Sequence, residues 1–212
     1  MWMALRGYAG KSRPVGALRI NRRRNSQGLI ELQVAQITNM GGPTRSERIR
    51  AEIVCSGDRL CTPESWTMRS RIFDAQGTAV PLTHVTTKGD TASGTITISG
   101  TGERKVFAPQ AFTAGWCLFD AVQRLPFDLR PLSFTMLDDM ELPKRNQRLS
   151  PGRSMDVRLG GRIVSLHSFE QVGEGILPYT YWLDEQHRLL MAIGGLRTFL
   201  FDPKVEIPED EV

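Results

Sequence analysis

The sequence has no hydrophobic run long enough to cross a membrane as a helix. Its longest mostly apolar run, Leu189 to Leu196, is far shorter than the roughly 20 residues that such a helix needs. Met1 to Arg6 also lack the positive start, apolar stretch and small-residue cleavage site of a secretory signal. We therefore expect no transmembrane segment, and either a cytoplasmic protein or a natural start upstream of Met1.

Short motifs of common enzyme and nucleotide-binding classes are also missing. Gly10-Lys11-Ser12 looks like the end of a phosphate-binding loop, but Leu5 stands where that motif needs a glycine. There is no G-x-S-x-G nucleophile elbow, no G-x-G-x-x-G after a strand and no H-E-x-x-H metal motif. Motifs thus assign no catalytic residue, and we expect no cofactor.

Cysteine and histidine are scarce, with three of each. Cys55 and Cys61 flank the turn-like stretch SGDRL, which predicts a disulfide between them in an oxidising compartment; the alternative is two unrelated buried thiols. A C-x5-C spacing without a second pair, and with scattered histidines, predicts no metal site. We assign Cys117 to core packing rather than to catalysis.

Positive charge is concentrated near the amino-terminal end. Residues 1–50 hold 10 Lys/Arg and 2 Asp/Glu, a net charge of +8, whereas the other 162 residues have a net charge of −4. Such asymmetry can indicate a surface for nucleic acid or anionic lipid. No aromatic residue is interleaved with Arg22-Arg23-Arg24, as a single-strand nucleic-acid surface would require. We interpret these arginines as the solvated face of strands and expect no nucleic-acid partner.

The dominant pattern is an alternation of apolar and polar residues, which is typical of half-buried β-strands. Arg45 to Cys55 shows it clearly, and similar segments recur with turn signals at intervals of about 8–12 residues. Lys88-Gly89-Asp90 is one expected turn. The pattern predicts an antiparallel meander of about 9–12 strands. We expect one domain over residues 14–203, an N-terminal segment over 1–13 and an acidic C-terminal tail over 204–212.

One segment, Thr113 to Leu125, has the period of a helix. Its apolar stripe at i, i+3, i+4 and i+7 consists of Leu118, Ala121, Val122 and Leu125. Thr113 is the expected cap and Pro126 the stop. Trp116 and Phe119 widen the apolar face, so we expect this helix to pack on the concave side of the sheet.

A late hairpin is predicted from Leu177–Asp184 and Leu189–Phe201, with Glu185 to Arg188 at its exposed tip. Both of its faces carry apolar residues, so one face covers the core and the other is free for a cavity or a partner. The candidate ligand-binding residues are Trp116, Phe119, Tyr181, Trp182 and Met191.

Acidic side chains offer an enzymatic alternative, a hydrolase with two carboxylates and His167 or His187. The acids available for it are Asp138, Asp139, Glu141, Glu170, Glu174 and Asp184. Sequence alone places no two of them within the required distance of about 5–10 Å.

The W-x-D-x-x-x-R-L unit formed by Trp182, Asp184, Arg188 and Leu189, at the end of a long meander, resembles uncharacterised bacterial envelope families of unknown function. RPVGALRINRRRN similarly resembles their first hairpin, so the likeness spans residues 14–201 in outline. These families are similar in fold to lipoprotein-carrier half-barrels. The resemblance implies a periplasmic or envelope location, although those families carry a secretion signal or lipoprotein cysteine and this chain shows neither.

Together these observations predict a mainly β, β-rich α+β protein. We expect a single strongly curved antiparallel sheet or half-barrel, largely a meander, wrapping one principal helix. The function we expect is non-enzymatic: the concave face binds an apolar or amphipathic ligand, such as a lipid or another hydrophobic small molecule, or a partner protein. A carboxylate-dependent hydrolase and a purely structural domain are the alternatives.

Overall fold

The computed structural model describes residues 1–6, 13–39, 45–92, 94–100, 102–107, 109–159, 161–195 and 197–207. Gly10-Lys11-Ser12 and the end of the acidic tail lie outside these ranges. The described residues form a single sheet of 15 strands. The strands are β1 (Trp2–Arg6), β2 (Arg13–Arg24), β3 (Ile30–Asn39), β4 (Arg45–Cys55), β5 (Pro63–Asp74), β6 (Val85–Ala92), β7 (Thr95–Ser99), β8 (Glu103–Phe107), β9 (Phe112–Ala114), β10 (Leu132–Asp138), β11 (Leu142–Leu159), β12 (Arg162–Val172), β13 (Tyr179–Asp184), β14 (Leu189–Gly194) and β15 (Arg197–Phe201).

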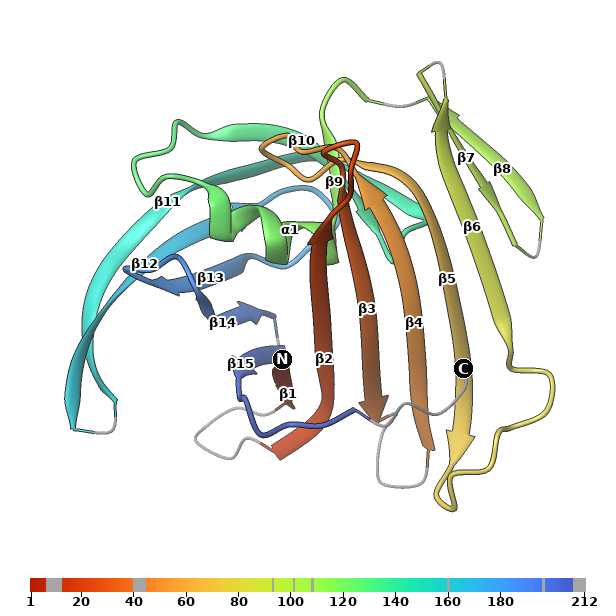
Figure 1. Cartoon of the computed structure of the whole chain (residues 1–212), viewed down its shortest axis with the longest axis horizontal. Helices are drawn as coiled ribbons and strands as arrows, with labels where there is room; N and C mark the ends of the chain where they lie inside the picture. The colour runs from red at the N-terminus through yellow and green to blue at the C-terminus, as the bar shows by residue number, and fades with distance from the viewer. Residues whose placement is uncertain are drawn as a thin grey trace.

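The sheet is a meander that begins and ends at its middle. Its order is β8-β7-β6-β5-β4-β3-β2-β1-β15-β14-β13-β12-β11-β10-β9, so the first and last strands pair with each other. Neighbours are antiparallel except β9 and β10, which are parallel. The edges, β8 and β9, are consecutive in the chain but do not pair, and the sheet curves strongly without closing (Figure 1). This confirms the predicted fold class.

The helix lies inside this curve (Figure 1). It is shorter than predicted: α1 spans Gly115–Ala121 and a single 3-10 turn, η1, spans Val122–Arg124. Thr113 does not cap it, because Thr113 belongs to β9 and its hydroxyl donates 2.6 Å to the Leu60 carbonyl. Apolar residues of α1 pack into the main core beside the inward residues of the sheet, such as Leu32, Ile53 and Phe169.

Two segments differ from the expected strand pattern. The expected strand Leu189–Phe201 is two strands, β14 and β15, which pair antiparallel after a turn in which Gly195 adopts φ +57°. The expected turn at Lys88-Gly89-Asp90 lies inside β6. Gly89 is there because the Trp66 ring lies over it: a Cβ on Gly89 would be 2.0 Å from Trp66 Cζ2. The sequence predicted a turn at this glycine, but its missing side chain instead makes room for the Trp66 ring.

Both chain ends contribute to the sheet or its packing. Residues Trp2–Arg6, expected to precede the domain, form β1 and pair with β2 and β15. Near the other end, Ile207 is buried against Ala17 and Ala35. Boundaries drawn at residues 14 and 203 therefore cut through packed structure.

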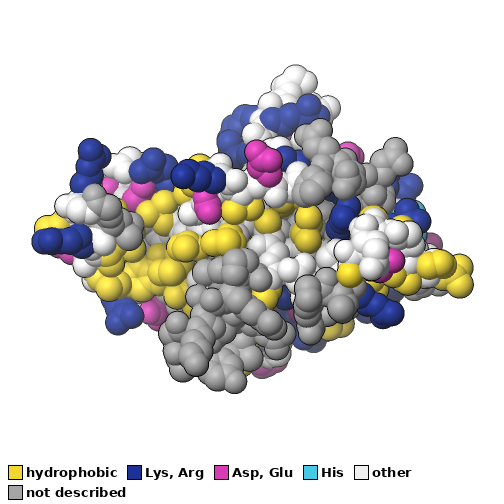
Figure 2. Space-filling model, turned by 90° about the horizontal axis from the view of Figure 1, so that it is seen from below, with side chains coloured by type: hydrophobic (Ala, Val, Ile, Leu, Met, Phe, Trp, Pro, Cys, Tyr) yellow, Lys and Arg dark blue, Asp and Glu magenta, His cyan; other side chains and the backbone are white. Residues whose placement is uncertain are grey.

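A band of hydrophobic side chains is visible on the face shown in Figure 2, bordered by Lys/Arg and Asp/Glu. Several large apolar residues of the chain are exposed, among them Ile163, Val172 and Leu177. No helix among the described residues combines the length and apolarity needed to cross a membrane. Such apolar surface on a folded domain is typical of a ligand or partner site.

Candidate ligand-binding site

A cavity of about 340 Å³ lies between α1 and the inner face of the sheet; we call it the inner cavity. Its aromatic and apolar walls include Trp116 and Phe119 from the helix, Met136 from β10, and Tyr179 and Tyr181 from β13. Because alternate residues of a strand point to the same face, Tyr179 and Tyr181 reach the cavity together. Its volume and apolar lining are those of a small-molecule site.

Phe119 is the centre of the aromatic wall. Its ring makes edge-on contacts with Trp2, Tyr181 and Phe199, with ring centroids 5.4, 5.9 and 5.4 Å apart. Such perpendicular arrangements are the favoured geometry of aromatic pairs and add to the stability gained by burial. The wall is therefore a fixed part of the core.

The polar groups buried behind this wall are hydrogen-bonded to each other. Tyr181 Oη donates to Gln171 Oε1 at 2.9 Å, and Gln171 Nε2 donates to Gln147 Oε1 at 3.2 Å. Gln147 Nε2 in turn donates to the Glu174 carbonyl at 3.0 Å. Burial raises the pKa of the Tyr181 hydroxyl well above its ordinary value and keeps it neutral. The cavity therefore presents no buried charge from this group.

The mouth of the inner cavity is polar on one side. Asp138, Asp139 and Arg197 line it there, and Leu177, which is 65% exposed, lines it as well. Asp139 and Met140 form a turn, with φ +48° and +60°, which closes with a 3.0 Å bond from the Glu141 amide to the Asp138 carbonyl. Charges thus meet the cavity only at its edge.

A second hollow of about 360 Å³ lies next to the inner cavity; we call it the acidic trough. It shares Asp139 and Arg197 with the inner cavity and adds Glu47 and Glu141. Burial, and then the negative charge of Asp139, raise the pKa of Glu47, while Arg197 opposes them. Three carboxylates face one guanidinium, so this end of the site is polar and net negative.

A third hollow of about 650 Å³ lies on the other side of Phe119; we call it the basic groove. It is lined by Arg22, Arg124 and Arg188 around the buried carboxylate of Asp120. Asp120 accepts from Arg22 Nε at 2.8 Å and from Arg124 Nε at 2.9 Å. Phe119 lines both this groove and the inner cavity and so separates them.

The structure brings together three of the five predicted ligand-binding residues. Phe119 and Tyr181 are buried, and Trp116 is half-buried with its indole nitrogen donating 3.1 Å to Gln36 Oε1. Trp182 and Met191 are cross-strand partners on the opposite face of the sheet, away from the inner cavity. There the Arg153 guanidinium lies 5.5 Å from the Trp182 ring centroid.

Asp184 organises the predicted hairpin tip. It is 2% exposed and accepts from the backbone amides of Gln186 and Arg188 at 3.0 and 2.9 Å. The Arg188 guanidinium adds bonds of 2.7 and 2.6 Å to the same carboxylate. An acid with all its acceptor sites occupied in this way is a structural residue.

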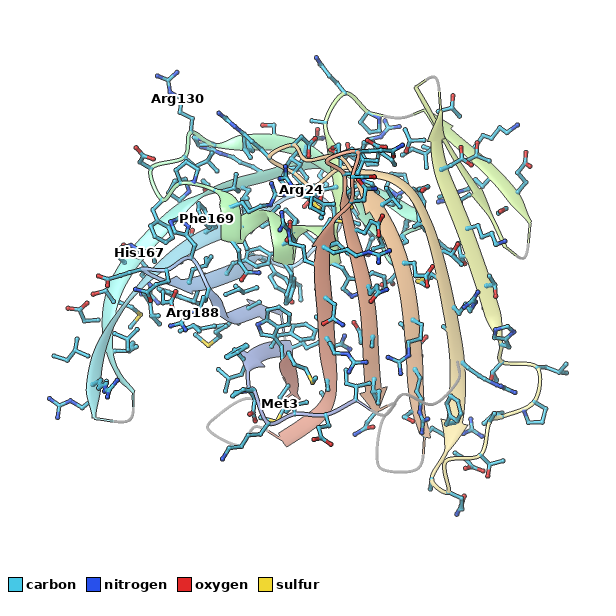
Figure 3. The ribbon with its side chains drawn as sticks, in the orientation of Figure 1. Met3, Arg24, Arg130, His167, Phe169 and Arg188 are labelled. Atoms are coloured by element: carbon cyan, nitrogen blue, oxygen red, sulfur yellow. The ribbon has the colours of Figure 1, made fainter. Side chains whose placement is uncertain are left out.

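The His187 ring stacks on one neighbour, Phe127, with centroids 4.0 Å apart and planes 5° apart. His167 stacks on Phe127 as well, at 4.2 Å, and its Nδ1 lies 2.8 Å from Ser154 Oγ. Figure 3 places His167 and Phe169 on the inner side of the sheet, toward α1. Neither histidine lines the inner cavity.

Of the six acids considered for catalysis, Asp138 and Asp139 line the inner cavity. Glu141 reaches the acidic trough instead, and Glu174 accepts 2.7 Å from Asn146 Nδ2.

Cys55, Cys61 and Cys117 are free thiols in this structure, so the Cys55–Cys61 disulfide stays a prediction.

Several lining residues were not predicted from the sequence. Tyr179 could have been found, because the alternation that selects Tyr181 selects it as well. Arg197 could not, since it reaches the mouth only because Gly195 turns the chain into β15.

The geometry defines a class: a mainly β protein whose open, curved sheet encloses a short helix and an apolar cavity. No protein-family model matches the chain, and no curated protein matches it. Among solved structures it is similar to a β-barrel-like protein of domain of unknown function DUF1849 from Brucella abortus, with 9% identity, a TM-score of 0.57, and coverage of 94% of this chain and 92% of that one. At this identity the likeness shows the fold alone, an uncharacterised β-barrel-like fold.

Proposed function

We propose that this protein is a non-enzymatic binding protein for an amphipathic ligand. The observation that carries the proposal is that the apolar inner cavity and the acidic trough are adjacent, with Asp139 and Arg197 lining both. Burial of apolar surface supplies most of the affinity at such a site, while a few polar groups fix the orientation of the ligand.

The charge of the trough narrows the class of ligand. Glu47, Asp139 and Glu141 surround Arg197, and the Glu141 carboxylate already accepts 2.7 Å from the Thr87 hydroxyl. An uncompensated anionic head group would be repelled by the remaining carboxylates. The ligand we propose has an apolar body in the inner cavity and a hydroxyl-bearing, zwitterionic or cationic end in the trough.

The first test uses 1-N-phenylnaphthylamine, a neutral fluorescent hydrophobic probe. Leu177→Asp places a charge at the cavity mouth on a residue that is 65% exposed, so the fold should tolerate it. We expect the probe to bind roughly tenfold more weakly, about 1.4 kcal/mol. Leu82→Asp is the matched control, because Leu82 is fully exposed and lines none of the three hollows. Equal affinities for the two variants would place the probe elsewhere.

A second pair of variants compares the two faces of the sheet. Trp116→Ala removes a wall of the inner cavity, whereas Trp182→Ala removes an indole from the opposite face. We expect Trp116→Ala alone to weaken probe binding, by several-fold. The reverse result would move the site to the Trp182 and Met191 face, which the sequence also offered for a partner protein.

The natural ligand is accessible by native mass spectrometry of protein purified from its own host. A stoichiometric, extractable amphiphile would support the proposal, and repeated recovery of ligand-free protein would oppose it.

We also propose an envelope location, for which the support is the resemblance of the Trp182–Leu189 unit and the early hairpin. Fractionation of host cells tests it.

A carboxylate-dependent hydrolase is the second candidate, because Asp138 and Asp139 line the same cavity. Both lie at its mouth, and Asp138 is 3.9 Å from Lys144 Nζ. The test is hydrolysis of a panel of p-nitrophenyl esters and glycosides. Turnover that Asp138→Asn or Asp139→Asn abolishes would establish this function; turnover unchanged by both would exclude it.

A further inference from the structure

Three buried thiols from separate parts of the chain converge beside the basic groove. Cys55 ends β4, Cys61 lies in the loop that follows, and Cys117 belongs to α1; each is 0% exposed. Their sulfur atoms all lie within 4.8 Å of one another, and Cys55 Sγ is 3.7 Å from Cys117 Sγ. The C-x5-C spacing on its own predicted no metal site, because the third thiol is brought in by the fold.

We propose that Cys55, Cys61 and Cys117 bind one thiol-seeking d10 metal ion, Zn²⁺ or Cu⁺. Thiolate sulfur selects these ions over hard cations such as Mg²⁺ and Ca²⁺. With metal–sulfur bonds of about 2.3 Å, ligand sulfurs in a tetrahedral site stand about 3.8 Å apart, close to the spacing of Cys55 and Cys117. A disulfide could use only two of the three sulfurs and would need them at about 2.05 Å.

The loop that carries Cys61 is held in place by hydrogen bonds. Asp58 Oδ1 accepts from the amides of Leu60 and Thr62 at 3.2 and 3.0 Å, and Asp58 Oδ2 accepts from the Thr62 hydroxyl at 2.7 Å. The Thr113 hydroxyl bonds the Leu60 carbonyl at 2.6 Å, which ties the loop to the strand before α1. Cys61 itself adopts φ +52°, a conformation that costs free energy for a non-glycine residue. The chain thus fixes the thiol before any metal arrives.

The buried carboxylate of Asp120 lies close to the thiols. Asp120 is 5% exposed, stands three residues after Cys117 in α1, and accepts from Arg22 Nε and Arg124 Nε. Asp120 is therefore the oxygen that could complete four-coordinate Zn²⁺, whereas three sulfurs alone suit Cu⁺.

The test uses the full chain, reduced and freed of metal under anaerobic conditions. Zn²⁺ and Cu⁺ are added separately, and bound metal per chain is measured by inductively coupled plasma mass spectrometry after gel filtration. Co²⁺ serves as the spectroscopic substitute for Zn²⁺, because thiolate ligation gives charge-transfer bands that oxygen ligands do not. We expect each chain to bind one ion and to release protons on binding. The affinity for the ion is measured by competition.

Variants separate the metal site from simple packing. Cys55→Ala, Cys61→Ala and Cys117→Ala should each weaken metal binding by at least about 100-fold. Ser56→Ala, at a half-buried neighbour whose hydroxyl oxygen is buried, should not. Asp120→Ala should weaken the binding of Zn²⁺ by about 10–100-fold. It should leave the binding of Cu⁺ unaffected if three sulfur ligands suffice for that ion. Circular dichroism checks that each variant is folded. If a variant unfolds, the wild-type thiols are alkylated instead, and bound metal should prevent this alkylation.

Two outcomes would overturn the proposal. One is reduced wild-type protein that takes up neither ion, whether or not it was isolated with a Cys55–Cys61 disulfide. The other is binding that survives the loss of each thiol in turn. Neither result bears on the inner cavity, so the proposed ligand-binding function stands or falls separately.

Discussion

Replacing Phe119 by alanine tests whether the aromatic wall is built as described. The ring is 5% exposed and contacts Trp2, Tyr181 and Phe199 edge-on. Deleting a buried phenylalanine side chain costs about 3–5 kcal/mol, because transfer free energy is lost and a cavity remains. Three edge-on pairs at about 0.5–1.5 kcal/mol each are of the same order, so the wall accounts for much of that cost.

Urea denaturation followed by circular dichroism measures this change. For a chain of this size the corresponding fall in melting temperature is about 2–4 °C per kcal/mol, so roughly 6–20 °C. Phe201→Ala is the matched control: Phe201 is 43% exposed and contacts Trp2 at a centroid distance of 6.4 Å. It should cost about 1 kcal/mol or less. A Phe119→Ala cost below about 1 kcal/mol would refute the packing described for α1.

Three further changes test other parts of the structure. Asp184→Ala should destabilise the protein by about 2–4 kcal/mol, because the hairpin loses its charged acceptor, whereas His187→Ala should cost about 1 kcal/mol by chemical denaturation. Gly89→Ala should cost at least about 1–3 kcal/mol, since its Cβ would meet the Trp66 ring, and Gly102→Ala, with open space around it, should be nearly neutral. Burial raises the pKa of Tyr179 and Tyr181, so these tyrosines ionise at lower pH in the unfolded chain than in the folded protein. The free energy of unfolding should therefore fall as pH rises above about 10. At the same pH, tyrosinate absorbance should be lower in the folded protein than in the denatured protein.

The strand pattern was predictable wherever one face of a strand is buried. Arg45–Cys55 was predicted with its observed bounds, because polar and apolar residues alternate from Arg48 to Ile53. The predicted total of about 9–12 strands was too low. Short strands such as β1 and β9 contain too few residues for alternation to be distinguished from chance.

Misplaced turns have a common physical cause. Glycine was taken as a turn signal at Gly89, where it instead makes room for Trp66, and Gly194-Gly195 was passed over inside an apolar run. A sequence shows that a glycine is present but not whether the chain needs its positive φ or its missing side chain. That choice depends on residues far away in the chain.

The site was predicted in part for the same reason. Trp116, Phe119 and Tyr181 were found because local periodicity places them on inward faces. Trp182 and Met191 share the apolar character but point to the other face, and only the register of β13 against β12 and β14 decides which face is inside. Arg197 and the third thiol depend on how the whole sheet curls.

Helix α1 serves the inner cavity and the thiol cluster at once. Trp116 and Phe119 face the cavity, and Cys117 and Asp120 face the thiols and the arginine pair. The helix has seven residues and no side-chain cap, so packing rather than intrinsic stability holds it in place. Loss of the Phe119 ring should therefore loosen the helix and increase the rate at which Ellman's reagent modifies the buried thiols of the metal-free protein under native conditions. Phe201→Ala should leave that rate unchanged. Equal rates in Phe119→Ala and wild type would mean that the thiols are held by the Asp58 loop alone, without help from the helix.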